Sequence, residues 1–131
     1  MSLEVAYACV LIAAVLPYIW VGIAKAGARG YDNRDPRGWM ARQSEPRRVR
    51  AYAAQLNAFE AFPIFAAGVA LASIAQVEEQ RIALLAVVFI VARVLHGVFY
   101  LADRATLRSL AWLVAIACSL ALLANAAMAV G

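Results

Sequence analysis

Six polar side chains interrupt otherwise apolar stretches of the sequence, in two groups of three. The groups are Arg50, Asn57 and Glu60, and Arg93, His96 and Tyr100. At ~100° per residue on a helix, the first group spans an arc of roughly 80° and the second about 60°. Each group therefore forms one polar stripe. Together they would suit a small ligand with both charges, because arginine can bind carboxylates bidentately and glutamate can bind an ammonium.

Each polar stripe lies within an apolar stretch, so the helices that carry the stripes must themselves be apolar. The 131 residues are 66% hydrophobic and only 15% charged, whereas a soluble domain is about half apolar and about a quarter charged. The sequence therefore predicts an all-α integral membrane protein, a single domain over residues 1–131. Four spans of ~20 residues fit this length, and we expect them at about 3–24, 50–75, 82–102 and 109–130. The first lacks a basic leader and a cleavage pattern, so we interpret it as a retained span.

The positive charge is concentrated in the connections between these spans. Residues 25–48 hold seven Lys and Arg, residues 103–108 two, and residues 76–81 one. The positive-inside rule then places the long basic loop in the cytoplasm and both termini outside. Short connections favour antiparallel neighbours, which gives an up-down four-helix bundle. This topology explains the net charge of +4 without nucleic-acid binding, and the basic loop would also attract an anionic ligand.

The two polar stripes reach similar depths in the predicted bundle. Glu60 lies ~15 Å deeper than Arg50, and on the antiparallel third span Arg93 lies ~10 Å deeper than Tyr100. We therefore predict a buried ion pair between Glu60 and Arg93. The alternative is that these polar groups only satisfy one another and fix the helix register.

Metal chemistry has little support in the sequence. Cys9 and Cys118 lie in separate apolar spans, and the chain has a single histidine, so no structural zinc site can be assembled. We interpret both cysteines as small core residues.

Two motifs resemble those of a known family. They are Arg50-Ala51 followed by Asn57-Ala58-Phe59-Glu60-Ala61-Phe62-Pro63, and Arg93-Val94-Leu95-His96-Gly97-Val98-Phe99-Tyr100. The first resembles the second-helix signature of the MAPEG family, the membrane-associated proteins in eicosanoid and glutathione metabolism. The second resembles its third-helix pattern Arg-x-x-(His/Tyr)-x-x-x-Tyr. The segment Leu101–Ser109 is most similar to the bacterial branch, and the resemblance covers nearly the whole chain.

The resemblance implies a homotrimer of four-helix subunits with glutathione bound between neighbouring subunits in the cytoplasmic half. It implies that glutathione is held by Arg50, Gln55, Asn57, Glu60, Arg93, His96 and Tyr100. It gives Arg108, or failing that Arg104, the role of stabilising the glutathione thiolate. Two positions depart from this picture: Gln55 points about 140° from Arg50, and Ala53 stands where eukaryotic members carry an arginine.

The implied function is a glutathione transferase or peroxidase of a bacterial inner membrane, acting on membrane-dissolved electrophiles. Glutathione is the co-substrate, and no metal or redox cofactor is needed. One alternative is a non-catalytic membrane trimer of the same fold with a structural or ligand-binding role. Another is a small multidrug transporter, but such transporters depend on a glutamate within the first helix, and here Glu4 lies at the edge of the first span.

Overall fold

Four long helices and one short helix form the structure, a computed structural model that describes residues 1–131. They are α1 (Leu3–Lys25), α2 (Pro36–Ala41), α3 (Pro46–Ile74), α4 (Glu79–Leu101) and α5 (Ala105–Val130). The four long helices are long and apolar enough to cross a membrane. The predicted all-α bundle of four apolar helices is therefore confirmed.

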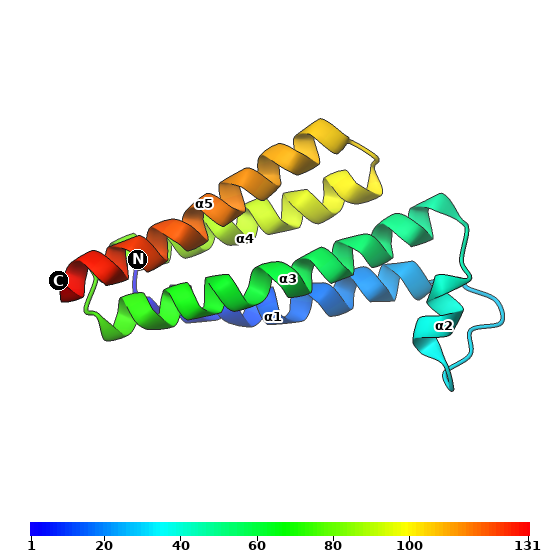
Figure 1. The fold of residues 1–131 in the computed structure, drawn as a ribbon, viewed down its shortest axis with the longest axis horizontal. Helices are drawn as coiled ribbons and strands as arrows, with labels where there is room; N and C mark the ends of the chain where they lie inside the picture. The colour runs from blue at the N-terminus through cyan, green and yellow to red at the C-terminus, as the bar shows by residue number, and fades with distance from the viewer.

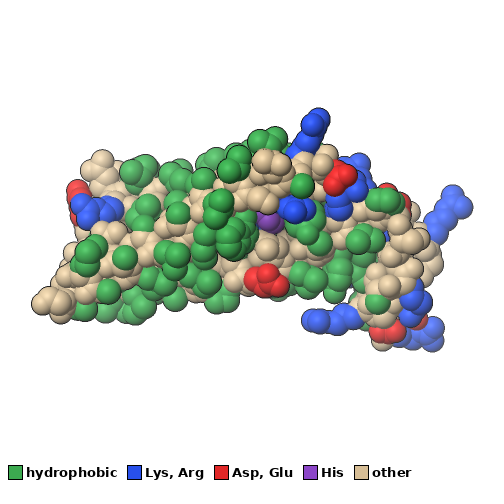
Figure 2. All heavy atoms as spheres, turned by 45° about the horizontal axis from the view of Figure 1, so that its top comes forward, with side chains coloured by type: hydrophobic (Ala, Val, Ile, Leu, Met, Phe, Trp, Pro, Cys, Tyr) green, Lys and Arg blue, Asp and Glu red, His purple; other side chains and the backbone are tan.

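The long helices pair as two antiparallel hairpins, α1 with α3 and α4 with α5 (Figure 1). Helix α3 also contacts α4 and α5, and α1 contacts α4. Both termini and the α3–α4 turn lie at one end of the bundle, which we call the terminus end (Figure 1). The opposite end, called the loop end, carries residues 26–45 with α2 and the α4–α5 turn. In Figure 2, hydrophobic side chains run along the bundle and most Lys and Arg side chains gather at the loop end.

Helix α3 extends beyond its predicted span because a side chain caps its N-terminus. Helix α3 begins at Pro46 rather than near residue 50. The Glu45 side chain accepts hydrogen bonds from the backbone N–H groups of Arg47 and Arg48, at 3.0 and 2.8 Å. Proline is favoured in the first turn, where its missing N–H is not needed.

Short helix α2 was not predicted from the sequence. The Asp35 side chain accepts a hydrogen bond from the Gly38 N–H at 3.0 Å, and Pro36 starts the helix. Trp39 and Met40 are buried against Ala24 and Ala51. The basic loop therefore includes an ordered helix that packs on the ends of α1 and α3.

Helices α3 and α4 end in the same way. Gln76 and Asp103 have positive φ values of 60° and 57°. The next N–H groups, of Val77 and Arg104, donate back to the carbonyls of Ala72 and Phe99 at 3.0 and 2.9 Å. This hydrogen-bond pattern is the Schellman motif, which ends a helix sharply and allows a short connection.

A packed apolar layer closes the bundle near its middle. Phe65 of α3 and Phe89 of α4 stack with ring centroids 3.8 Å apart, beside the fully buried Val69 and Leu122. A Cβ atom on Gly68 would lie 3.0 Å from the Leu122 Cβ, so α3 and α5 approach closely here. We call Phe65, Val69, Phe89 and Leu122 the apolar floor, because the polar residues described below lie between it and the loop end.

Candidate functional site

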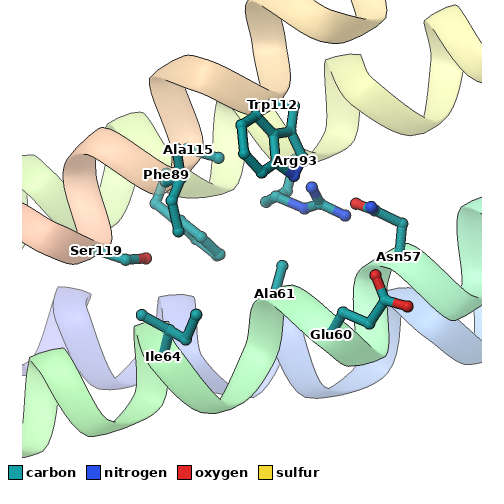
Figure 3. A pocket seen from close by; sticks show the side chains of 10 residues that line it. Asn57, Glu60, Ala61, Ile64, Phe89, Arg93, Trp112, Ala115 and Ser119 are labelled. Carbon is teal, nitrogen blue, oxygen red and sulfur yellow. The ribbon is translucent and has the colours of Figure 1, made fainter.

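Two adjoining cavities lie between α3, α4 and α5. The inner cavity has a volume of about 180 Å³. It is lined by Asn57, Glu60, Ala61 and Ile64 of α3, Phe89 and Arg93 of α4, and Trp112, Ala115, Ile116 and Ser119 of α5 (Figure 3). Phe89, a residue of the apolar floor, forms one wall of this cavity. The polar lining residues come from all three helices.

The outer cavity lies nearer the loop end and has a volume of about 430 Å³. It is lined by Asn57, His96, Tyr100, Arg108, Ser109, Trp112 and Leu113. Asn57 and Trp112 line both cavities, so a group bound in one lies directly beside a group bound in the other.

The same helical spacing brings the lining residues together from each helix. On α4 the steps are four, three and four residues, giving Phe89, Arg93, His96 and Tyr100. On α5 the same steps give Arg108, Trp112, Ala115 and Ser119. Residues at such steps share one helix face. The sequence prediction that Asn57, Glu60, Arg93, His96 and Tyr100 meet in one region therefore agrees with the structure.

Several polar groups of the site are buried without a hydrogen-bond partner in the protein. Arg93 and His96 are each 3% exposed, and Ser119 is 1% exposed. Arg93 Nη1, Asn57 Oδ1 and Ser119 Oγ have no partner. Figure 3 shows the Arg93 guanidinium and the Asn57 amide pointing toward each other across the cleft. An unsatisfied buried polar group costs about 1–3 kcal/mol, so these atoms are suited to bind water or a ligand.

Aromatic contacts position the cation of the outer cavity. The Arg108 guanidinium lies over the Tyr100 ring, 4.4 Å from its centroid. Tyr100 in turn packs edge-to-face on His96, with centroids 5.6 Å apart. A guanidinium at this distance is attracted to the aromatic face, so Tyr100 holds the positive charge at the cavity.

The predicted ion pair between Glu60 and Arg93 is wrong for the subunit. The two ion pairs of the structure are Arg34 with Asp32 and Arg42 with Asp35, all in the loop. Glu60 is exposed and Arg93 is buried, although both line the inner cavity. Glu60 therefore lines the cavity at an exposed position and Arg93 at a buried one.

Three other predicted site residues lie apart from this cluster. Arg50 reaches α4, where its Nη2 donates to the Leu101 carbonyl at 3.4 Å, and its Nε has no partner. Gln55 lies on another face of α3, where it lines a cavity of about 190 Å³ together with Lys25 and Arg37. Arg104 is exposed at the N-cap of α5.

Sequence reasoning missed three residues of the cleft. Trp112, Ser109 and Ser119, which line the cavities, were not among the predicted site residues. The spacing from Arg108 to Trp112 and Ser119, four and eleven residues, is the signal that could have identified these two, whereas Ser109 has no such signal. Asn125, a further polar residue of α5, accepts a hydrogen bond from Arg81 Nη1 at 2.9 Å near the terminus end.

The cleft can bind an anionic or strongly hydrogen-bonding ligand. Arg93 and Arg108 supply positive charge, while Asn57, His96 and Tyr100 supply further hydrogen-bonding groups. No three His, Cys, Asp or Glu side chains come together as a metal-binding group.

Comparison with known proteins gives a family match across almost the whole chain. The family model described as MAPEG family matches residues 5–128. The search of curated proteins finds no match.

Proposed function

The chain belongs to the MAPEG family, and on this basis we propose that it is a membrane-bound glutathione transferase or peroxidase. It is a multi-pass membrane protein with four candidate transmembrane helices. The proposed co-substrate is glutathione, and the proposed second substrate is an electrophile or hydroperoxide dissolved in the bilayer.

The observation that carries this proposal is the position of Arg108. Its guanidinium is held over Tyr100 at an outer cavity of about 430 Å³, a volume within the usual range of small-molecule sites. His96 and Asn57 line the same cavity. A cation beside hydrogen-bonding groups fits a peptide with carboxylates and a thiol.

The proposed chemistry is activation of the glutathione thiol. A free thiol has a pKa of about 8.5, so only a minority is thiolate at neutral pH, and a nearby guanidinium increases that share. In the transferase reaction, the thiolate sulfur forms a bond to an electrophilic carbon, from which the leaving group departs. In the peroxidase reaction, two glutathione thiols reduce one hydroperoxide to an alcohol and water and become a disulfide.

Glu60 supports the proposal that the active form is a homotrimer with sites between subunits. It lies midway along α3 (Pro46–Ile74) and is exposed on the subunit surface. A carboxylate facing lipid at this depth would be costly, so we propose that a neighbouring subunit covers it. Gln55, with Lys25 and Arg37 on its separate face, would then contribute from one subunit to the site of the next.

We also propose an orientation in the membrane. The loop end carries most of the Lys and Arg residues, so it faces the cytoplasm of a bacterial cell and both termini face outward. Glutathione would then enter the outer cavity from the cytoplasm.

The test is to purify the protein in detergent, add glutathione, and measure thiolate absorbance and conjugation of chlorodinitrobenzene. We expect glutathione-dependent thiolate absorbance and turnover. If an intact trimer neither binds glutathione nor turns over, the enzyme proposal fails and a non-catalytic membrane trimer takes its place. Ala53, where eukaryotic members carry arginine, would be the first position to examine in that case.

A further inference from the structure

We propose that a groove between α4 and α5 binds one acyl chain of an anionic phospholipid, whose phosphate lies beside Arg104 at the loop end. The groove has a volume of about 350 Å³, and all its lining residues are hydrophobic and come from these two helices. None of them lines the inner or the outer cavity. The proposal is independent of the thiol chemistry, because lipid binding is measured without glutathione.

Small side chains form the bottom of the groove and larger ones form its walls. Ala92 of α4 and Ala111 of α5 line the groove and are only 5% and 8% exposed. The lining residues Val91, Leu95 and Leu110 are exposed beside them. The two alanines leave a depression between the helices. A flexible hydrocarbon chain lying in it would gain dispersion contacts with both helices.

The groove is about as long as one leaflet of a bilayer is thick. Along α4 its lining runs from Val87 to Phe99, which is ~18 Å at ~1.5 Å per residue. Half of the hydrocarbon core of a bilayer is ~15 Å. Phe99 lies close to the end of α4 at the loop end, so the groove begins near the membrane surface and ends near the middle of the membrane. An acyl chain of the loop-end leaflet occupies the same depth.

Arg104 lies where such a chain would join its headgroup. The backbone N–H of Arg104 donates to the carbonyl of Phe99 at 2.9 Å, and Phe99 lines the groove. Steps of three and four residues along α5 lead from Arg104 to the lining residues Leu107 and Ala111, and residues at such steps share one helix face. Arg104 is therefore at the loop end of the α5 wall.

The charge of Arg104 complements an anionic headgroup. Its side chain is exposed and takes part in neither of the two ion pairs of the structure. Arg108, one turn later, lies instead over Tyr100 at the outer cavity. A guanidinium can bind phosphate oxygens bidentately, and anionic lipids attract basic residues next to membrane helices. An anionic phospholipid therefore matches both the apolar groove and the cation at its end.

The first experiment compares phosphatidylglycerol with phosphatidylcholine, both carrying palmitoyl and oleoyl chains. Native mass spectrometry of the full chain in mild detergent measures the affinity for each lipid. We expect phosphatidylglycerol to bind roughly five- to tenfold more tightly. Arg104→Gln should remove this preference, whereas Arg29→Gln, which removes an exposed charge from the loop between α1 and α2, should not. Equal affinities in the parent protein, or the same loss in both variants, would overturn the proposal.

Asp103 tests the sign of the interaction. Its carboxylate is exposed and directly precedes Arg104. Its φ of 57° is a value that asparagine also adopts, so Asp103→Asn should keep the turn. Removing this negative charge should strengthen phosphatidylglycerol binding about two- to fivefold. An unchanged or weaker affinity would show that the headgroup does not lie at this turn.

Filling the groove tests the position of the acyl chain. Ala111→Leu should weaken binding of both lipids, whereas Ala124→Leu, at an exposed position of α5 nearer the terminus end, should not. Thermal unfolding checks that each variant is folded. If Ala111→Leu is not folded, dihexanoyl phosphatidylglycerol replaces it as the test, because its short chains should bind the parent protein roughly tenfold or more weakly. Unchanged lipid binding by a folded Ala111→Leu, or equal binding of the short-chain lipid, would place the acyl chain elsewhere.

Two other occupants of the groove would also overturn the proposal. Oleate that binds more tightly than phosphatidylglycerol, and loses affinity in Arg104→Gln, would make the ligand a free fatty acid. A second copy of the chain would be revealed by Leu110→Cys, at an exposed position of the wall. Both native cysteines are buried, so disulfide-linked dimers of this variant in oxidised membranes would mean that another copy covers the groove.

Discussion

At the scale of single residues, the arginines of this chain divide between structural and ligand-facing positions. Arg48 Nε donates to the Ala24 carbonyl at 2.8 Å, and Arg50 reaches the Leu101 carbonyl. These two side chains therefore hold the C-terminal ends of α1 and α4, where positive charge is favourable. Arg93 and Arg108 instead line the cleft and are available for chemistry.

The proposed role of Arg108 predicts a specific loss. Arg108→Ala should remove the glutathione thiolate absorbance and lower the conjugation rate roughly a hundredfold, by analogy with the removal of one charge-stabilising group from other enzymes. Ultraviolet difference spectra and steady-state assays measure the two effects.

Arg104→Ala is the matched control for this substitution. It removes the same charge four residues earlier, at an exposed position, and should leave the thiolate absorbance unchanged. If Arg108→Ala keeps the thiolate absorbance and Arg104→Ala loses it, Arg104 rather than Arg108 stabilises the thiolate.

The sequence predicted that Asn57, Glu60, Arg93, His96 and Tyr100 gather in one region, because helical spacing decides which residues of one helix share a face. It also placed Arg50 there, which the structure does not. It could not predict that Glu60 and Arg93 stay apart. Their pairing depends on how α3 is rotated against α4, which the packing of side chains such as Phe65 and Phe89 determines. The angle of about 140° between Gln55 and Arg50 indicated that Gln55 faces away from the polar stripe. It could not show which residues Gln55 would lie beside.

At the scale of the helices, the first turn of α3 depends on a charged cap. Hydrogen bonds from the backbone N–H groups of Arg47 and Arg48 hold the pKa of the Glu45 carboxyl below its usual value. The stabilisation is therefore fully present above the ordinary glutamate pKa of about 4.3. It is lost as the pH falls through the lowered pKa of the folded state.

Glu45→Gln should accordingly lower the thermal unfolding temperature at pH 7, and the difference from the parent protein should disappear at strongly acidic pH. Glu78→Gln is the control, because Glu78 occupies the same position before α4 but makes no capping hydrogen bond. Unfolding followed by circular dichroism across pH would show this, and a Glu45→Gln difference that persists at low pH would contradict the capping role.

The close approach of α1 and α4 depends on a glycine. A Cβ atom at Gly97 would collide with the ring of Trp20, which is only 6% exposed. Gly97→Ala should therefore destabilise the protein by about 1–3 kcal/mol through overpacking. Denaturant or thermal unfolding in detergent measures the change.

Gly22→Ala serves as the comparison, since no atom lies within 4 Å of a Cβ atom placed there. It should be neutral or slightly stabilising, because alanine favours helix over glycine. If both variants lose the same stability, the contact with Trp20 is not the reason that a larger side chain at position 97 is unfavourable.

Hydropathy predicted the number, order and apolar extent of the long helices. It could not predict α2 or the early start of α3, because these features depend on hydrogen bonds that the backbone N–H groups of Gly38 and Arg47 donate to the Asp35 and Glu45 side chains. Polar side chains form these caps, and a search for apolar spans does not detect them.

At the scale of the whole molecule, the surface of one subunit carries a carboxylate where a membrane-spanning surface is normally apolar. Glu60 is exposed midway along α3. The proposed trimer predicts that native mass spectrometry of the detergent-solubilised protein will give three times the 14.1 kDa of one chain. A single-chain mass in mild detergent would contradict it.

Glu60→Leu provides a sharper test of what surrounds this carboxylate. If Glu60 lies at a glutathione site between subunits, glutathione should raise the unfolding temperature of the parent protein, and Glu60→Leu should keep the trimer mass but lose that rise. Leu71→Ala, an exposed position on the same helix, should retain that rise. A glutathione response in Glu60→Leu equal to that of the parent protein would remove Glu60 from the site.

The apolar floor limits how far the polar cleft extends along the bundle. Phe65, Val69, Phe89 and Leu122 are all buried to within 2% and close the bundle on the side of the termini. The charged cleft is therefore a blind pocket that ends about halfway through the bundle. The protein can therefore hold the buried Arg93 guanidinium within a membrane-spanning helix, while packed apolar side chains separate it from the terminus end.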